Sequence, residues 1–217
     1  VQGPSNPGFG VPDSQGRWTG FNVDLCRAVA IMIFGDPDKI QISALTTQTR
    51  FPALQSGEVD LLTNNTTVTL TRDTQLKFNF PAITFFDGQG ILVPRRLNLT
   101  SGKQLSGATV CVQPGTTTEL ALTDFFRKNN MRFTPVVIQS RDELTRAYAD
   151  GRCDALTSDA TTLAAQRSTL ANPADHVILP DRLSKEPLGL AVRHGDEEFR
   201  DIVAWAFNTL VNAEELG

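Results

Sequence analysis

The chain has 217 residues and a formal net charge of −4, with 40% hydrophobic and 20% charged residues, which is the composition of an ordinary globular protein. Nucleic-acid binding usually requires a basic surface, so this acidic balance argues against nucleic acid as a partner. No apolar run approaches the ~18 residues of a membrane span, and we recognise no signal peptide within the chain.

The first half of the chain predicts an alternation of strands and helices. It opens with a hairpin around Gly16, followed by a helix that starts near Asn22, a candidate N-cap, and ends at Gly35. Thr69 is a candidate cap for a short helix that begins near Leu70. The other expected elements are a strand over residues 41–45, a helix over 50–56, a strand over 58–63, and extended segments over 80–86 and 88–94.

The second half predicts a fresh α/β series after a polar, basic linker. A capping box, Thr116 to Glu119, opens a helix over residues 119–130. The further expected strands cover residues 108–113, 133–139, 153–158 and 176–180, with an extended segment over 186–192, and the further helices cover 141–151, 159–171 and 197–215. Strands that alternate with helices favour largely parallel sheets flanked by helices.

Two stretches of twelve residues, 53–64 and 147–158, are related in sequence without a gap: ALQSGEVDLLTN and AYADGRCDALTS. Each predicts the end of a helix, a glycine that stops it, and a short apolar strand. This internal repeat indicates two lobes of similar wiring.

The two extended segments that flank the second series can serve as crossovers between the lobes. We therefore expect lobe 1 to comprise residues 1–92 and 188–217, and lobe 2 to comprise residues 93–187. The hinges are expected near residues 88–95 and 185–192.

Polar groups of opposite sign follow the two related strands. Arg72, with the Thr67 hydroxyl nearby, can grip a carboxylate through two parallel hydrogen bonds. The N–H groups of Thr116 and Thr117 open a helix and form a second candidate anion site. Asp159 can act as the counter-ion of an ammonium group. Ligands of open α/β sheets lie outside the carboxyl ends of strands, so the pattern favours a small zwitterion.

Each of these residues also has an ordinary structural interpretation. Arg72 can be a surface arginine at a helix start, and Thr116 can form a capping box only. Asp159 can be a routine N-cap, and Phe9 can pack either on a ligand or in the core.

The cysteines and histidines of the sequence argue against a metal site. Cys111 and Cys153 lie in two strand-like runs, and the sequence leaves open a disulfide between them or two buried thiols. The chain has no CxxC, and its two histidines have no ligand-like spacing, so we expect no metal site. The chain also contains no nucleophile elbow, phosphate loop or dinucleotide fingerprint, and we expect no cofactor and no enzymatic activity.

Several long motifs together resemble one family. In chain order they are PGF, GRWTGFNVDLCRAVA, RFPALQSGEVDLLTNNTTVTLTRD, TFFDGQGILV, VCVQPGTTTEL, GRCDALTSD and KEPLGLAVR. They are similar to the polar amino-acid-binding proteins of bacterial ABC importers, solute-binding protein family 3, and to their general L-amino-acid-binding components in particular. The resemblance implies a two-lobed type II periplasmic-binding-protein fold, a periplasmic location, and delivery of an L-amino acid to an ABC permease in the membrane.

The resemblance also implies roles for individual residues. It implies that Arg72, Thr67 and the N–H of Thr117 bind the ligand carboxylate, and that Asp159 and Asn65 bind the ammonium. The side-chain pocket is implied at Phe9, Asn64, Thr118 and Asn6.

Asn6 and Thr47 stand where many relatives carry aromatic residues, which favours a broad or polar ligand range over a strict binder of basic amino acids. Two alternatives share the scaffold: an enzyme similar to cyclohexadienyl dehydratase, and the ligand-sensing domain of a receptor. A Cys just before Val1 in close relatives would be the implied partner of Cys26.

Overall fold

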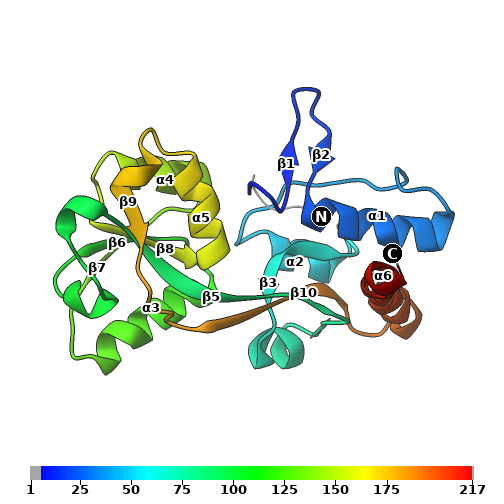
Figure 1. Cartoon of the computed structure of the whole chain (residues 1–217). Coiled ribbons are helices and arrows are strands. Elements are labelled where there is room, and N and C mark those ends of the chain that lie inside the picture. The colour runs from blue at the N-terminus through cyan, green and yellow to red at the C-terminus, as the bar shows by residue number, and fades with distance from the viewer. Residues whose placement is uncertain (1–5, 217) are drawn as a thin grey trace. The chain divides into compact units, whose positions relative to one another are not determined.

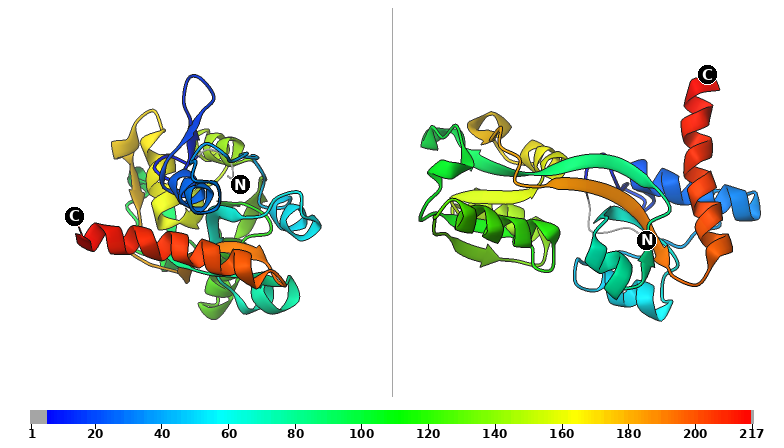
Figure 2. Two further views of the ribbon diagram at one scale, coloured as in Figure 1. Left: turned by 90° about the vertical axis from the view of Figure 1, so that its right-hand side faces the viewer. Right: turned by 90° about the horizontal axis from the view of Figure 1, so that it is seen from below.

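The computed structural model describes residues 6–216, and the chain separates into two compact α/β units (Figure 1). Unit 1 comprises the chain up to Phe86 and from Pro187 onward, and unit 2 comprises Asp87–Glu186. The chain passes from one unit to the other inside two long strands, β5 (Ile83–Pro94) and β10 (Lys185–Arg193), which are drawn in green and orange in Figure 2. The lobe boundary expected after residue 92 falls later in β5 than the change of unit in the structure.

Unit 1 begins with the expected hairpin, in which β1 and β2 flank Gly16 in a positive-φ turn (φ 78°). The remaining elements pack around β3, β4 and β10, which pair antiparallel. Their bounds are β1 (Val11–Pro12), β2 (Trp18–Thr19), α1 (Phe21–Phe34), α2 (Arg50–Ser56), β3 (Leu62–Thr67), a π-helical turn η1 (Thr71–Gln75), β4 (Phe78–Asn79) and α6 (Glu197–Leu216).

Two apolar clusters sandwich the strands of unit 1. Alternate residues of a strand point to opposite faces, so Leu190 and Val192 pack with α1 and α6, whereas Ala191 packs with α2 and Phe78. Helix α6 lies beside α1 (Figure 1). Helix α2 ends as predicted, because Gly57 takes the left-handed conformation (φ 81°) that terminates a helix.

Three expectations for unit 1 are wrong. The strand expected over residues 58–63 lies later, as β3 (Leu62–Thr67), so the polar residues 64–67 belong to the strand. Residues 41–45 form no strand in the structure; only residue 44 takes part in a bridge. Asn22 is not the N-cap of α1, because the helix already begins at Phe21 after Gly20. Glycine is a common N-cap, and its φ of 121° is one that other residues rarely adopt. Asn22 is instead a buried residue of the first turn.

Unit 2 contains the second α/β series. It opens with two short 3-10 turns, η2 (Arg95–Leu97) and η3 (Gly102–Gln104). The other bounds are β6 (Thr109–Val112), α3 (Thr117–Lys128), β7 (Thr134–Val137), α4 (Arg141–Ala149), β8 (Ala155–Asp159), α5 (Ala160–Ser168), a 3-10 turn η4 (Pro173–Asp175) and β9 (His176–Ile178).

The helices of unit 2 cover both faces of its sheet. Val110 and Val112 point toward α3, where Leu122 and Phe126 are fully buried. Cys111, between them, points to the opposite face, which α4 and α5 cover. This separation follows from the period of two in a strand, and it gives unit 2 two apolar layers, one on each side of the sheet.

The expectation of largely parallel sheets holds for part of unit 2 only. Strand β6 pairs parallel with β7 and with β8. The other pairings described in this unit, β5 with β8 and β5 with β9, are antiparallel. The reason is that β5 is a crossover strand rather than a member of the βαβ series, so its direction is not set by a preceding helix.

Cys111 and Cys153 form a disulfide, with their Cα atoms 5.6 Å apart. Of the two possibilities that the sequence leaves open, a disulfide or two buried thiols, the structure shows the disulfide. The bond joins β6 to the residue pair that precedes β8, beneath the buried side chains of Leu144 and Tyr148. Cys26 is buried in unit 1, with its Sγ 3.5 Å from the Thr63 hydroxyl oxygen.

Candidate functional site

In unit 1, three of the residues that we predict to bind the ligand lie along the end of β3. Asn64 and Thr67 are buried, and Asn65 is half-buried. Asn65 has a φ of 26°, a conformation that non-glycine residues seldom adopt and that occurs often at functional sites. Its Oδ1 accepts a hydrogen bond from Asn22 Nδ2 over 3.1 Å. Asn22 thus fixes one end of the Asn65 amide.

Two polar atoms at this strand end have no hydrogen-bond partner among the described residues. They are Asn64 Oδ1 and Asn65 Nδ2, both of which are buried. Buried polar atoms are satisfied in the great majority of cases, so an exception calls for an explanation. One acceptor and one donor, side by side, are the complement of a ligand that carries both kinds of group.

Arg72 lies in η1 and is buried, with 6% of its surface exposed. Its backbone N–H donates to Thr69 Oγ1 over 3.2 Å, so Thr69 caps the turn as predicted. One guanidinium nitrogen donates to the Thr67 carbonyl oxygen over 2.7 Å, and the guanidinium carbon lies 4.8 Å from the centre of the Phe51 ring. The surface interpretation of Arg72 is therefore wrong, because the side chain is fixed against β3 and an aromatic face.

Arg50 is a second buried cation that the sequence analysis missed. Its guanidinium donates to the Asn64 carbonyl oxygen over 3.1 Å and lies 4.6 Å from the Phe51 ring centre, measured from Cζ. The same nitrogen lies 3.4 Å from the Thr66 hydroxyl oxygen, so Arg50 supports the backbone and a side chain of β3. The signal in the sequence was weak, because an arginine at the first position of a short helix is usually exposed.

Phe9 and Asn6 lie in the turn that precedes β1. Phe9 is half-buried and makes edge-to-face contacts with Phe21 and Phe85, with ring centroids 6.2 and 5.8 Å apart. Asn6 is buried, and its backbone pairs with Gly10. These aromatic contacts fix the Phe9 ring within unit 1. They agree with the core-packing interpretation of Phe9 and leave its contact with a ligand as a prediction.

In unit 2, the predicted anion site is the start of α3. Thr116 is the N-cap: its hydroxyl accepts from Glu119 N over 3.1 Å. The Glu119 carboxylate accepts from Gly115 N over 2.8 Å, one residue earlier than a reciprocal box requires. The helix itself begins at Thr117, two residues before the expected start. The N–H of Thr117 therefore belongs to the first helical turn, where the positive end of the helix dipole favours anions.

The side chains at this helix start are held by neighbours. Thr117 Oγ1 donates to Glu186 Oε2 over 2.9 Å, and the hydroxyls of Thr118 and Thr116 are 2.8 Å apart. Gln89 Nε2 donates to the Thr118 carbonyl oxygen over 2.9 Å. Thr118 is thus buried and fixed through both its backbone and its hydroxyl.

Asp159 ends β8 and is the residue before α5, yet its side chain makes no capping hydrogen bond to that helix. Asp159 therefore occupies the N-cap position that the ordinary interpretation gives it, but its side chain does not cap the helix. Its charge acts on Arg141: burial lowers the pKa of Arg141, and the carboxylates of Asp159 and Asp142 oppose that shift. Arg141 is half-buried at the first position of α4, where the helix dipole disfavours a cation. Its place in the site is not evident from the sequence, because Arg141 looks like an ordinary charge in a first turn.

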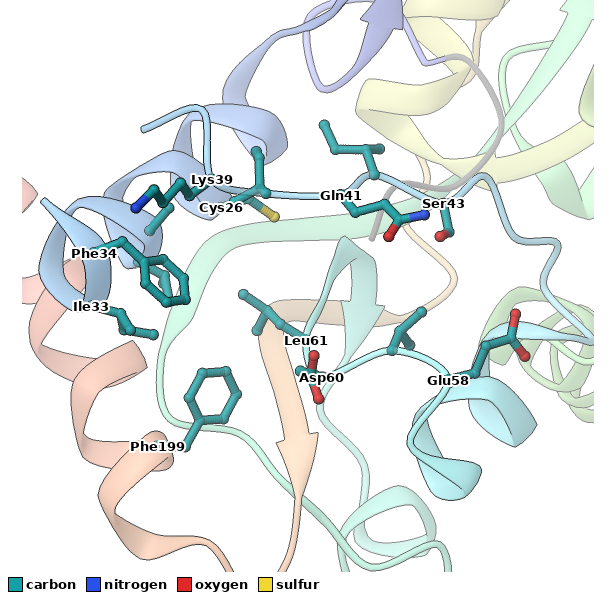
Figure 3. Close-up of a pocket in the computed structure, with 15 residues that line it drawn as sticks. Cys26, Ile33, Phe34, Lys39, Gln41, Ser43, Glu58, Asp60, Leu61 and Phe199 are labelled. Atoms are coloured by element: carbon teal, nitrogen blue, oxygen red, sulfur yellow. The ribbon is translucent and has the colours of Figure 1, made fainter. Parts of the chain in front are cut away.

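Two cavities described in the structure lie away from these residues. One, of about 510 Å³, lies in unit 1 between α1 and the segments 39–43 and 58–61 (Figure 3). The other, of about 560 Å³, lies in unit 2 near Tyr148 and His176. Neither is lined by a residue of the predicted site.

No helix within residues 6–216 combines the length and apolar character of a membrane span. No cluster of three His, Cys, Asp or Glu side chains in that same range could hold a metal ion.

The two α/β units and the two strands that connect them are those of a two-lobed type II periplasmic binding protein. A sequence profile of the bacterial extracellular solute-binding proteins, family 3, matches residues 2–217. The chain belongs to that family.

Curated relatives are about half identical in sequence. The general L-amino acid-binding periplasmic protein AapJ of Rhizobium johnstonii is 52% identical over 97% of this chain and 62% of its own length. The glutamate/glutamine/aspartate/asparagine-binding protein BztA of Rhodobacter capsulatus is 53% identical over 98% of this chain and 64% of its own length. The chain therefore spans less than two thirds of these two relatives.

Solved structures agree with the fold. A periplasmic binding protein of an ABC transporter from Brucella ovis, with glutathione bound, has a TM-score of 0.95 and 51% identity, and the match covers 100% of this chain and 68% of that one. An ancestral arginine-binding protein bound to arginine has a TM-score of 0.84 and 28% identity, with 97% and 91% covered.

Proposed function

We propose that this chain is part of an extracytoplasmic binding protein that captures an L-amino acid between its two units and delivers it to an ABC permease in the membrane. The observation that carries the proposal is the placement of opposite charges in different units: buried Arg72 in unit 1 and Asp159 in unit 2. The relatives' names support it, since they are amino-acid-binding proteins and periplasmic. A periplasmic location follows for this chain as part of the same proposal.

The α-carboxylate is assigned to unit 1 and to the start of α3. One nitrogen of Arg72 donates to the Thr67 carbonyl oxygen, and a guanidinium has the planar fork of N–H donors that grips a carboxylate at two points. The Thr67 hydroxyl and the backbone N–H of Thr117 complete the assigned set. Together they offer charge and direction, which is what a planar anion requires.

The ammonium group is assigned to Asp159, supported by an amide of β3. The family resemblance implies Asn65 as the partner, but the orientation of the two amides favours a different division. Asn64 Oδ1 is the buried acceptor and suits an ammonium, whereas Asn65 Nδ2 is a donor and suits a carboxylate oxygen. Asn22 holds Asn65 in this orientation.

Arg141 narrows the proposed ligand class. The carboxylate of Asp159 acts on the guanidinium of Arg141 electrostatically, so a ligand held by Asp159 is also subject to the positive charge of Arg141. A ligand side chain that ends in a carboxylate or an amide oxygen suits that charge. BztA is named for glutamate, glutamine, aspartate and asparagine, whose side chains all end in such an oxygen. We therefore place acidic and amide side chains among the preferred ligands, with Thr118, Phe9 and Asn6 at the side-chain pocket.

Closure follows from the same charges. In a binding protein of this kind the ligand bridges both units, with hinges at residues 88–95 and 185–192. To move the two units from about 1:99 to 99:1 closed, a ligand must favour the closed form by about 5.5 kcal/mol. A two-point carboxylate grip at roughly 1.5–3 kcal/mol per charge-assisted hydrogen bond, together with the ammonium contact, is sufficient.

We assign no catalytic step to the chain. The dehydratase alternative requires a positioned general acid, and the named relatives at about half identity are binding proteins.

A thermal-shift screen of the common L-amino acids tests the proposal, because a ligand that binds only the folded state raises stability by mass action. We expect glutamate, glutamine, aspartate and asparagine to raise the melting temperature. The absence of a shift with every amino acid, in a protein that melts cooperatively, would contradict the proposal.

A further inference from the structure

Asp159 is placed where an aspartate ordinarily caps a helix. It is the residue directly before α5 and has the extended backbone of an N-cap (φ −55°, ψ 141°). An aspartate in this position usually accepts from the N–H of the second or third helical residue. Here the side chain makes no such bond. Something else must therefore satisfy the first turn of α5.

Asp87 does so. Its Oδ2 accepts from the backbone N–H of Thr161, the second residue of α5, over 3.2 Å, and also from the Thr161 hydroxyl. Its Oδ1 accepts from Gly88 N over 2.7 Å. Asp87 thus supplies, from β5, the carboxylate that caps α5.

The register of the sheet explains how Asp87 reaches that helix. β5 runs antiparallel to β8 with Gln89 opposite Asp159. Asp87 lies two residues before Gln89, and Thr161 lies two residues after Asp159. In an antiparallel pair these two positions are again opposite each other. The capping carboxylate comes from the segment in which the chain enters unit 2.

We infer that Asp87 is a positioning residue that occupies the capping site of α5 and so keeps the Asp159 carboxylate directed toward the ligand ammonium. This inference rests on the proposed function. Without Asp87, the Thr161 N–H becomes an unsatisfied donor at the positive end of a helix. Asp159 is the nearest carboxylate in sequence, and it then turns to the helix end and away from the ligand.

The rival explanation is that Asp87 only stabilises unit 2. The two explanations differ in what happens to recognition of the ammonium. Loss of stability alone lowers the apparent affinity for all ligands alike, whereas diversion of Asp159 weakens only ligands that carry an ammonium. The discriminating quantity is the affinity of L-glutamate divided by that of L-2-hydroxyglutarate, in which a hydroxyl replaces the ammonium.

We would measure this ratio by calorimetry in the wild type and in Asp87→Ala. We expect the ratio to fall at least tenfold in the variant. Asp154→Ala is a matched control, because Asp154 Oδ2 accepts from both the backbone N–H and the hydroxyl of Thr109, over 2.8 and 2.7 Å. That variant loses the same kind of contact in the same unit and should keep the wild-type ratio.

A second variant, Asp87→Asn, keeps the size of the side chain but removes its negative charge from the start of α5, so it remains informative if Asp87→Ala fails to fold. We expect its ratio to fall at least threefold. An unchanged ratio in either folded variant, or an equal fall in Asp154→Ala, overturns the inference. Asp159→Ala distinguishes failure of this inference from failure of the proposed function. The proposed function itself fails if the wild-type protein binds no amino acid, or if Asp159→Ala binds glutamate as tightly as the wild type.

Discussion

Replacement of Arg72 by alanine should abolish most of the affinity for every amino acid, whatever its side chain. The α-carboxylate is common to all of them, and Arg72 is the cation assigned to it. Two charge-assisted hydrogen bonds at about 1.5–3 kcal/mol each give a loss of about 3–6 kcal/mol, or roughly 10²- to 10⁴-fold in affinity. Calorimetry with glutamate, glutamine and alanine as ligands measures it.

The same substitution has a separate effect on folding. It removes the 2.7 Å hydrogen bond to the Thr67 carbonyl oxygen and the contact with the Phe51 ring. We expect a cost of about 1–3 kcal/mol in the free energy of unfolding, measured by urea denaturation without ligand. The loss of binding free energy in Arg72→Ala should therefore exceed its loss of unfolding free energy.

Two further variants serve as comparisons for Arg72→Ala. Arg72→Lys retains the charge without the planar fork and should bind with intermediate affinity. Arg17→Ala removes an exposed arginine of the same unit, whose side chain is 72% exposed in an ion pair with Asp13, and should bind like the wild type. Wild-type affinity in folded Arg72→Ala would refute the assignment of the carboxylate.

Three other variants give separate predictions. Replacing Cys111 and Cys153 by serine opens a loop of 42 residues and should cost about 2–4 kcal/mol of stability; an unchanged urea midpoint would show that the bond is dispensable. Burial lowers the pKa of His176, so its neutral form stabilises the fold above the ordinary histidine pKa. That contribution should be lost as the pH falls below about 6.5, and His176→Gln should flatten the change in melting temperature between pH 7 and 5. Arg141→Gln should weaken glutamate at least tenfold more than alanine in calorimetry; equal effects on both would exclude a role in specificity.

Much of the fold follows from local signals in the sequence. The glycines that close the helices of the two related stretches do so for a backbone reason, because Gly57 and Gly151 both have a positive φ. The strands after them end in the polar groups expected there. The disulfide is decided only by the three-dimensional register of β6 against β8, which composition does not reveal.

What the sequence could not predict depends on contacts distant along the chain. In the sequence, Asp159 is a candidate counter-ion of an ammonium group or a routine N-cap, and nothing near it indicates another cap for α5. The carboxylate that caps α5 belongs to Asp87, which lies 74 residues before Thr161, whose N–H donates to it. Arg50 and Arg141 look like exposed charges at helix starts, and only tertiary packing shows that Arg50 is buried and Arg141 half-buried. Residues 41–45 have the apolar character of a strand, but an apolar run forms a strand only where a neighbour pairs with it.

The central claim is that one zwitterion is held by a cation of unit 1 and an anion of unit 2. Its most direct measurement is calorimetry of the wild-type protein with L-glutamine, with its α-carboxamide, and with its 2-hydroxy analogue. Each modified ligand removes one charge and leaves the protein unperturbed. We predict that both analogues bind at least a hundredfold more weakly than glutamine; an analogue that binds as tightly as glutamine would contradict the claim for the charge it lacks.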